Sequence, residues 1–220
     1  MDWIGHYNTR QYKFIDIVRD IFDCNNLLIL HQKVYTGEVP NLDLQAGLDQ
    51  GTFFHNRFYE TIRQDNRFLS AYKSFIDEII ISNHFPHRDD MMYQKIPTFR
   101  VHLPNNKSVG GTSHKDSDYN HPSGEINFLV PLTSMRGSNS VFYETHPGYK
   151  DFRFKELDPG QYWEFDGNRC EHGNIQNVTG WTRVSFDFRM ISEYDLKHAP
   201  ETYSIAHGLK FTKGEYYEKI

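Results

Sequence analysis

The first part of the chain has apolar residues at the spacing of α-helices. They recur every three or four positions within 14–22 and again within 69–80. Because an α-helix has about 3.6 residues per turn, side chains at this spacing share one face and form a stripe that packs against a core. A further helix is predicted for 53–62, and the turn-like residues 37–40 interrupt the series.

After Pro97 the hydrophobic pattern changes to strict alternation, which is typical of strands with one buried face. The alternating segments are 99–103, 126–130, 141–143, 162–165 and 184–190. They are separated by the turn signals Pro104-Asn105-Asn106, Pro122-Ser123-Gly124, Pro147-Gly148, Pro159-Gly160, Asp166-Gly167 and Thr179-Gly180. Many short strands between turns predict an antiparallel sandwich or barrel such as a jelly roll, or double-stranded β-helix. The expected fold class is α+β and mainly β, with the helical region packed on one face of the sheets.

The chain is expected to form a single domain over its 220 residues. Within it we expect a mainly helical N-terminal region at 1–96, a jelly-roll core at 97–192 and a C-terminal extension at 193–220. The extension has no clear pattern. It is expected either to wrap back on the domain or to contact a second copy of the chain, as in a homodimer.

Composition narrows the classes of partner. The chain has 24 basic and 29 acidic residues, a formal net charge of −5, which disfavours a nucleic acid or an anionic membrane as partner. Cys24 and Cys170 have no CxxC spacing and indicate reduced thiols in a cytoplasmic protein. The first residues are charged and lack the apolar core of a signal peptide. The most apolar run, 79–81, is far shorter than the roughly 20 residues that cross a bilayer.

The strongest local signal for chemistry lies in the segment 110–116, Gly-Gly-Thr-Ser-His-Lys-Asp. In an extended chain His114 and Asp116, two positions apart, point to the same side and can face one metal ion. His172 follows a later predicted strand and turn. Two imidazoles and one carboxylate are the facial triad of non-haem iron(II) oxygenases, which leaves coordination positions open. His-x-Asp alone has little weight in a chain with 12 histidines.

The predicted strand 183–190 strengthens this interpretation. Arg183, Ser185, Asp187 and Arg189 lie on one of its faces, and apolar residues lie on the other. The polar face either contacts water or lines a ligand cavity while helices cover the apolar face. Arg183 lies eleven residues after His172, so one turn returns the chain beside the metal. Its planar guanidinium is suited to pair with a carboxylate, and Ser185 can donate to the same group.

These motifs together resemble the 2-oxoglutarate- and iron(II)-dependent dioxygenases. More narrowly, SHKDSDYNHPSGEINFLVPLT and CEHGNIQNVTGWTRVSFDFRMI resemble the StrG-like group, named after a streptomycin-biosynthesis protein, and the resemblance covers about 98–191. It implies that the chain hydroxylates a small polar molecule, using O2 and releasing succinate and CO2.

The resemblance also implies roles for particular residues. His114, Asp116 and His172 would ligate Fe(II). Arg183 would pair with the distal carboxylate of the cosubstrate 2-oxoglutarate, supported by Ser185. Asn127 would be a further contact to the cosubstrate, or else a polar residue on an exposed strand face.

Several alternatives stay open at this point. Arg100 and His102 share one strand face, for which solvent exposure is favoured over contact with substrate or cosubstrate. His121 and Asp118 lie near the triad, but the proline after His121 and the two-residue spacing favour the pair His114 and Asp116 as ligands. Other functions on the same fold are a cupin-type metal-dependent isomerase or lyase and a non-catalytic carbohydrate-binding jelly roll. A nucleic-acid demethylase is disfavoured by the acidic charge balance.

Overall fold

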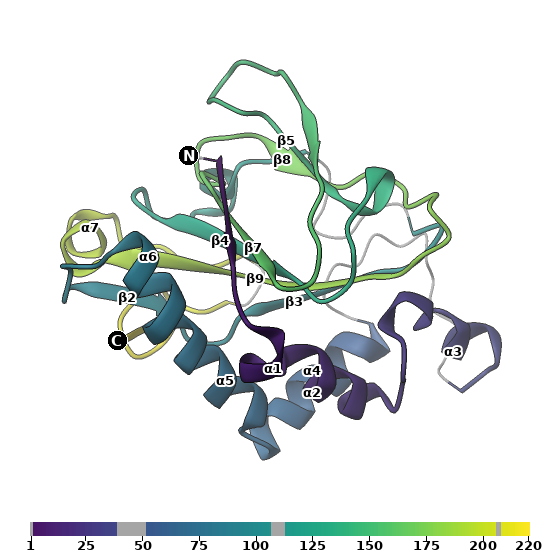
Figure 1. Cartoon of the computed structure of the whole chain (residues 1–220). Coiled ribbons are helices and arrows are strands. Elements are labelled where there is room, and N and C mark those ends of the chain that lie inside the picture. The colour runs from purple at the N-terminus through teal and green to yellow at the C-terminus, as the bar shows by residue number, and fades with distance from the viewer. Residues whose placement is uncertain (1, 39–51, 107–112, 206–207) are drawn as a thin grey trace.

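The computed structural model describes residues 2–38, 52–106, 113–205 and 208–220. The predicted turn at 37–40 and the glycines of the segment 110–116 therefore lie partly or wholly outside the described residues. Within the described residues the chain forms three layers, which are a set of helices, a large sheet and a small sheet (Figure 1).

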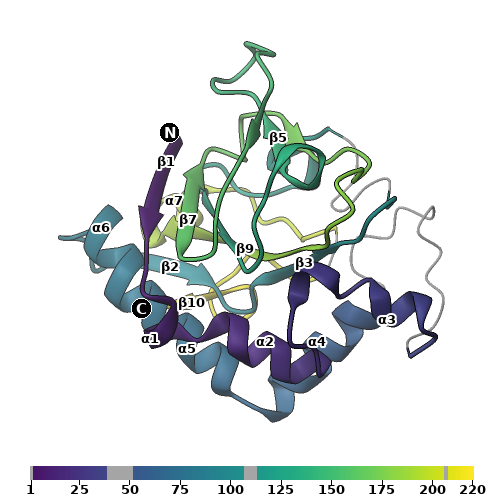
Figure 2. The ribbon, with the colours of Figure 1, turned by 45° about the vertical axis from the view of Figure 1, so that its right-hand side comes forward.

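The N-terminal half supplies the helical layer, and the helices predicted at 14–22, 53–62 and 69–80 are confirmed. The helices are α1 (Thr9–Tyr12), α2 (Phe14–Phe22), α3 (Gln32–Tyr35), α4 (Phe53–Gln64), α5 (Arg67–Phe75) and α6 (Ser82–His84). A 3-10 turn spans Leu27–Ile29, and a π-helical stretch, Ile76–Ile81, joins α5 to α6. The helices run beneath the large sheet, and α2 and α4 lie under β3 (Figure 2).

The sheets are antiparallel throughout the described pairings. The large sheet contains β1 (Asp2–His6), β2 (Met91–Gln94), β3 (Thr98–His102), β4 (Ile126–Pro131), β7 (Gln161–Phe165), β9 (Arg183–Ser192) and β10 (Tyr217–Lys219). Its order is β1-β7-β4-β9-β2-β10, and β3 also pairs with β9. The small sheet has the order β6-β5-β8, with β5 at Val141–Tyr143, β6 at Arg153–Lys155 and β8 at His172–Gly173. The short helix α7 (Glu193–His198) follows β9 directly.

Strand β9 lies at the centre of the large sheet and is buried along its whole length. It pairs with β4 on one edge and with β3 and β2 on the other. Its apolar side chains face the helices, where Phe186 contacts the rings of Phe14 and Phe68. Arg183, Asp187 and Arg189 on its other face line a pocket below the small sheet. The interpretation that the polar face of this strand contacts water is therefore wrong.

Not all strands follow the pattern that the sequence indicates. β1 and β2 precede Pro97 and lie within the region expected to be mainly helical, where the sequence pattern did not indicate them. Every residue of β2 is buried, and a strand buried on both faces has no alternation to detect. In the extension, β10 pairs with β2, so this part of the chain wraps back on the domain. Among the described helices, none has both the length and the apolar composition needed to cross a bilayer.

Candidate metal centre

Two neighbouring backbone segments bring the candidate ligands together. His114 N donates to His172 O at 3.0 Å, and His172 N donates to His114 O at 2.9 Å. This pairing places the two imidazole rings with centroids 4.6 Å apart. After His114 the chain is extended at Lys115 and enters a 3-10 turn at Asp116–Tyr119. The side chains of His114 and Asp116 consequently point to the same place.

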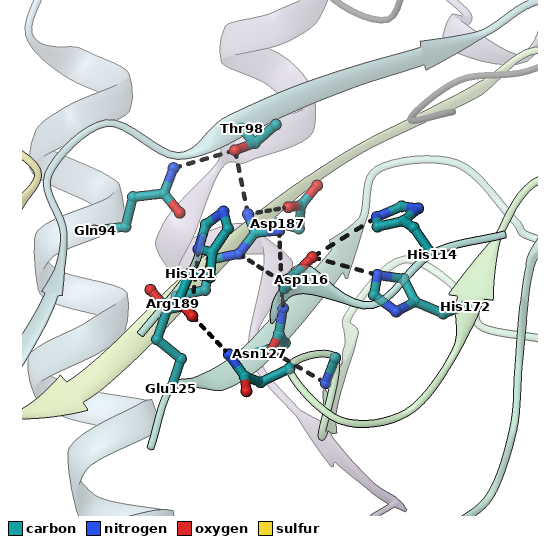
Figure 3. A network of polar contacts seen from close by, with 12 residues as sticks. Gln94, Thr98, His114, Asp116, His121, Glu125, Asn127, His172, Asp187 and Arg189 are labelled. Carbon is teal, nitrogen blue, oxygen red and sulfur yellow. Dashed lines mark hydrogen bonds and ion pairs between the residues drawn. The ribbon is translucent and has the colours of Figure 1, made fainter. Parts of the chain in front are cut away.

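Three ligand atoms converge on one point between the sheets (Figure 3). Asp116 Oδ1 lies 3.7 Å from His114 Nε2 and 3.6 Å from His172 Nε2. Atoms that bind one ion at about 2.1 Å lie about 3–4 Å from one another. The three side chains are thus spaced to hold a metal ion as they stand.

The backbone orients the ring of His172. His172 Nδ1 lies 3.0 Å from Cys170 O, so it donates to this carbonyl and leaves Nε2 facing Asp116. Burial lowers the pKa of His172 to about 4, and the opposite charge of Asp116 does not offset it. The ring is therefore neutral near neutral pH, which is the form that binds metal.

The second oxygen of Asp116 is engaged by protein donors. Arg189 Nε and Nη2 donate to Asp116 Oδ2 at 3.1 and 3.0 Å, and Asn127 Nδ2 donates to it at 2.6 Å (Figure 3). Burial is the largest single influence on Asp116 and opposes its ionisation, but the charge of Arg189, with smaller contributions from His121, His172 and Asn127, lowers the pKa of this carboxyl below its ordinary value. Asp116 is thus a buried carboxylate with one oxygen directed at the histidines.

Asn127 lies behind Asp116 and is 1% exposed, so its interpretation as a polar residue on an exposed face is wrong. Its Oδ1 accepts from Gly167 N at 3.2 Å, and Gly167 O accepts from Asp116 N at 2.8 Å. A Cβ on Gly167 would lie 2.7 Å from Asn127 Nδ2, so a side chain at this position would displace the Asn127 amide from its contacts. The described contacts of Asn127 are to Asp116 and to the predicted turn at Asp166-Gly167, not to the pocket.

The candidate ligands His114 and His172 line a pocket between the two sheets. Its walls combine charged groups from β3 and β9 with apolar groups from β4, β5 and β7. The lining residues are Arg100, His114, Leu129, Val141, Phe165, His172, Gly173, Asn174, Arg183, Asp187 and Arg189. The pocket gives a bound metal ion an adjoining space in which a small ligand can lie.

Arg183 reaches the wall of this pocket, as expected from its place on β9. It is 1% exposed, and its Nη1 and Nη2 donate to Asn139 O at 3.1 Å and to Asn174 Oδ1 at 2.8 Å. Ser185 does not line the pocket. Its hydroxyl is fully buried and has no hydrogen-bond partner within the described part of the chain.

The polar residues of β3 also face inward, so the favoured interpretation of a solvent-exposed face is wrong for both. Arg100 lines the pocket and its Nε donates to Asp187 Oδ1 at 2.8 Å. His102 is fully buried, with Nε2 3.2 Å from Asn106 O. Asp187 and Arg189 also line the pocket, and the sequence pattern assigned no role to either residue. Their position on the charged face of the predicted strand 183–190 could have indicated that they face the site.

A second group of possible ligands lies behind the first and consists of Asp116, His121 and Glu125. Its ligand atoms already have partners. His121 Nδ1 lies 2.8 Å from Glu125 Oε2, and the hydroxyl of Tyr217 donates to Glu125 Oε1. The positive charge of Arg189 on Asp116 further disfavours a cation there. Asp118 accepts from Lys115 N at 2.9 Å and caps the turn, so it belongs to neither group.

A protein of known name is similar to the chain along nearly its whole length. The streptomycin biosynthesis protein StrG of Streptomyces griseus is 31% identical over 218 residues, which cover 97% of this chain and 96% of StrG. The chain belongs to the StrG family. No protein-family model matches the chain.

Solved structures resemble this StrG-family chain only distantly. EvdO2 from Micromonospora carbonacea var. aurantiaca, solved with 2-oxoglutarate, is 13% identical with a TM-score of 0.45, covering 87% of this chain and 94% of its own. AviO1 from Streptomyces viridochromogenes Tue57 is 12% identical with a TM-score of 0.45, covering 90% and 92%. The nickel complex of the non-heme monooxygenase ThoJ is 15% identical with a TM-score of 0.43, covering 82% and 69%. These likenesses are too low to support a conclusion about activity.

Proposed function

We propose that this StrG-family chain is a 2-oxoglutarate- and iron(II)-dependent oxygenase that hydroxylates a small polar molecule and releases succinate and CO2. The convergence of His114 Nε2, His172 Nε2 and Asp116 Oδ1 beside a pocket with Arg183 in its wall carries this proposal. The two facing antiparallel sheets support a double-stranded β-helix as the fold of the core at 97–192.

The donor set fits ferrous iron. Two neutral imidazoles and one carboxylate suit a divalent transition metal, and three protein ligands leave positions for a chelating cosubstrate and O2. Bound iron supplies the oxidising chemistry, whereas the chain binds and orients the reactants and keeps water out. His172 is fixed through Cys170 O and Asp116 through Arg189 and Asn127, so the ligands need little rearrangement when the ion enters.

The charges around the pocket support a dianionic cosubstrate. Among the described residues, Arg100, Arg183 and Arg189 line the pocket with Asp187, and Asp116 lies beside them. Three guanidinium groups and two carboxylates give a net charge of +1, and a ferrous ion adds to it. A ligand with two carboxylates compensates this positive charge in a site of low dielectric constant.

Arg183 is our candidate for the distal carboxylate of 2-oxoglutarate. Arg100 and Arg189 already pair with Asp187, and Arg189 also pairs with Asp116. The two hydrogen bonds of Arg183 described above go to neutral oxygens, which an incoming carboxylate can displace. Ser185, two residues along the same strand face, has a buried hydroxyl without a hydrogen-bond partner among the described residues, and we propose that it assists Arg183 although it does not line the pocket. The role of StrG in streptomycin biosynthesis supports a small-molecule substrate.

Spectroscopy without oxygen tests the proposal. Adding iron(II) and 2-oxoglutarate to the purified protein should produce a weak visible charge-transfer band, and admitting air should release succinate. His114→Ala should abolish the band because it removes one of the ligands. Thr52→Ala, on the helical side of the molecule, is a matched control that should leave the band unchanged.

The alternative functions predict other outcomes. A cupin-type isomerase or lyase would bind metal without a 2-oxoglutarate band, and a carbohydrate-binding module would show neither. Either result, together with no succinate under air, would reject the oxygenase.

A further inference from the structure

The two oxygens of Asp116 have different surroundings. Oδ1 faces both histidine Nε2 atoms, whereas Oδ2 receives hydrogen bonds from Arg189 Nε, Arg189 Nη2 and Asn127 Nδ2 at 3.1, 3.0 and 2.6 Å. A carboxylate oxygen has about two lone-pair directions, so three donors leave Oδ2 little capacity for a further partner. The protein thus distinguishes the two oxygens before any ion is bound.

We propose that Arg189, assisted by Asn127, is a positioning residue that restricts Asp116 to a single metal-binding oxygen. This inference rests on the proposed function, because it takes Asp116 as a ligand. A carboxylate that turned both oxygens toward the ion would occupy one of the positions needed for cosubstrate or O2. By holding Oδ2, Arg189 keeps that position open.

Arg189 can serve as a fixed anchor because its own position is determined by further contacts. Its Nη1 donates to Asp187 Oδ2 at 2.7 Å and lies 3.4 Å from Thr98 Oγ1. The other oxygen of Asp187 accepts from Arg100 at 2.8 Å. Strands β3 and β9 therefore brace the guanidinium on the side away from Asp116, and it is 6% exposed. A guanidinium so held presents its remaining N–H groups in one direction.

Cobalt(II) binding to the metal-free protein provides a first test that does not depend on activity. Arg189→Met should weaken cobalt affinity about 10- to 100-fold, the usual effect of losing an outer-shell partner. The cobalt affinity of Arg189→Lys should lie between those of the wild type and Arg189→Met, because lysine keeps the charge but not the two-point contact. Arg136→Met is the matched control, since it removes a guanidinium whose ion pairs are with Asp158 and Glu156 and not with the groups that hold Asp116. Its cobalt affinity should stay within about threefold of the wild type.

Chemical rescue provides a second test that a purely structural role would not pass. Asp116→Ala should lose cobalt binding, and added formate should restore part of it, because Arg189 and Asn127 remain to hold the small carboxylate by one oxygen. The double variant Asp116→Ala with Arg189→Met should show no rescue at the same formate concentration. Thermal melts of each variant establish that the protein is folded before binding is measured.

The results separate this inference from the proposed function. Formate rescue that is equal with and without Arg189, or cobalt affinity unchanged in Arg189→Met, would overturn the role of Arg189 even if the 2-oxoglutarate band is present. A missing band with Arg189-dependent rescue would instead overturn the oxygenase and leave the positioning of Asp116 intact. If Arg189→Met does not fold, Arg189→Lys replaces it in both tests. Its cobalt affinity, and the formate rescue of Asp116→Ala combined with Arg189→Lys, then decide the role of Arg189.

Discussion

Replacing Arg183 with methionine probes the proposed cosubstrate site. The guanidinium is buried at the pocket wall, where it donates to Asn139 O at 3.1 Å and Asn174 Oδ1 at 2.8 Å. Methionine has a similar length and fills the space of the apolar stem, but it has no charge and no donor. The change therefore removes the carboxylate partner with little loss of packing.

The size of the effect follows from the hydrogen bonds that are exchanged. Two bonds from a guanidinium to a carboxylate contribute roughly 3–6 kcal/mol. Displacing the present bonds to Asn139 and Asn174 costs about 1 kcal/mol for each. The net contribution of Arg183 to the free energy of 2-oxoglutarate binding is about 2.5 kcal/mol, which corresponds to about 70-fold in affinity.

An anaerobic titration measures this loss. Iron(II)-loaded protein is titrated with 2-oxoglutarate and followed by the visible charge-transfer band, and iron affinity is measured separately. Arg183→Met should weaken 2-oxoglutarate binding about 70-fold and change iron affinity by less than about threefold. The 2-oxoglutarate affinity of Arg183→Lys should lie between those of the wild type and Arg183→Met, because a lysine ammonium is a point charge without the planar guanidinium group.

Arg100→Met is the control, because Arg100 lines the same pocket from the neighbouring strand but pairs with Asp187. Unchanged 2-oxoglutarate affinity in Arg183→Met would refute the reasoning, and so would an equal loss of iron affinity. A larger loss in Arg100→Met than in Arg183→Met would assign the carboxylate to Arg100 instead.

Three further changes test the surroundings of the site. Burial, followed by the charge of Arg183, lowers the pKa of His102 from 6.5 to about 3. The contribution of the buried neutral ring to the free energy of unfolding is therefore complete above pH 6.5, and it is lost as the pH falls from there toward 3. In denaturant titrations, His102→Gln should lose about 2 kcal/mol less stability than the wild type between neutral pH and pH 5, and burial of His172 should leave a remaining loss in both proteins. Gly173→Ala should weaken cobalt binding about tenfold by pushing β8 away, since its Cβ would lie 2.9 Å from Phe142 Cζ, and Phe142→Ala should restore it. Phe186→Ala should reduce the free energy of unfolding by about 3–5 kcal/mol, because the ring is fully buried.

Each of these predictions has a clear contrary result. A wild-type stability that falls with pH no more steeply than that of His102→Gln would contradict the buried neutral ring. Full cobalt affinity in Gly173→Ala would show that β8 tolerates the extra carbon. A loss under about 1 kcal/mol in Phe186→Ala would mean that the helical layer does not depend on this contact.

The sequence was most informative where one periodic signal dominates. The helical stripe at 14–22 and the alternation at 184–190 each bury one well-defined face, so their structure follows from local pattern. The convergence of His114, Asp116 and His172 could also be predicted, because a two-residue spacing and an intervening set of strands fix it approximately.

The role of Arg189 could not be predicted in the same way. Its partner Asp116 lies 73 positions away, and nothing local distinguishes Arg189 from Arg183, which lies three two-residue repeats earlier on the same strand face. The same applies to β10, whose pairing with β2 joins segments more than a hundred residues apart. Such contacts depend on strand register, which only the packed structure determines.

Strand β9 connects the stability of the fold with the chemistry of the site. Side chains alternate between its two faces, so a shift of register by one residue would carry Arg183 and Arg189 into the aromatic core and expose Phe186 to the pocket. Contacts of Phe186 with Phe14 on α2 and Phe68 on α5 oppose that shift. The helical layer, although remote from the candidate ligands, therefore fixes the depth at which each guanidinium enters the pocket.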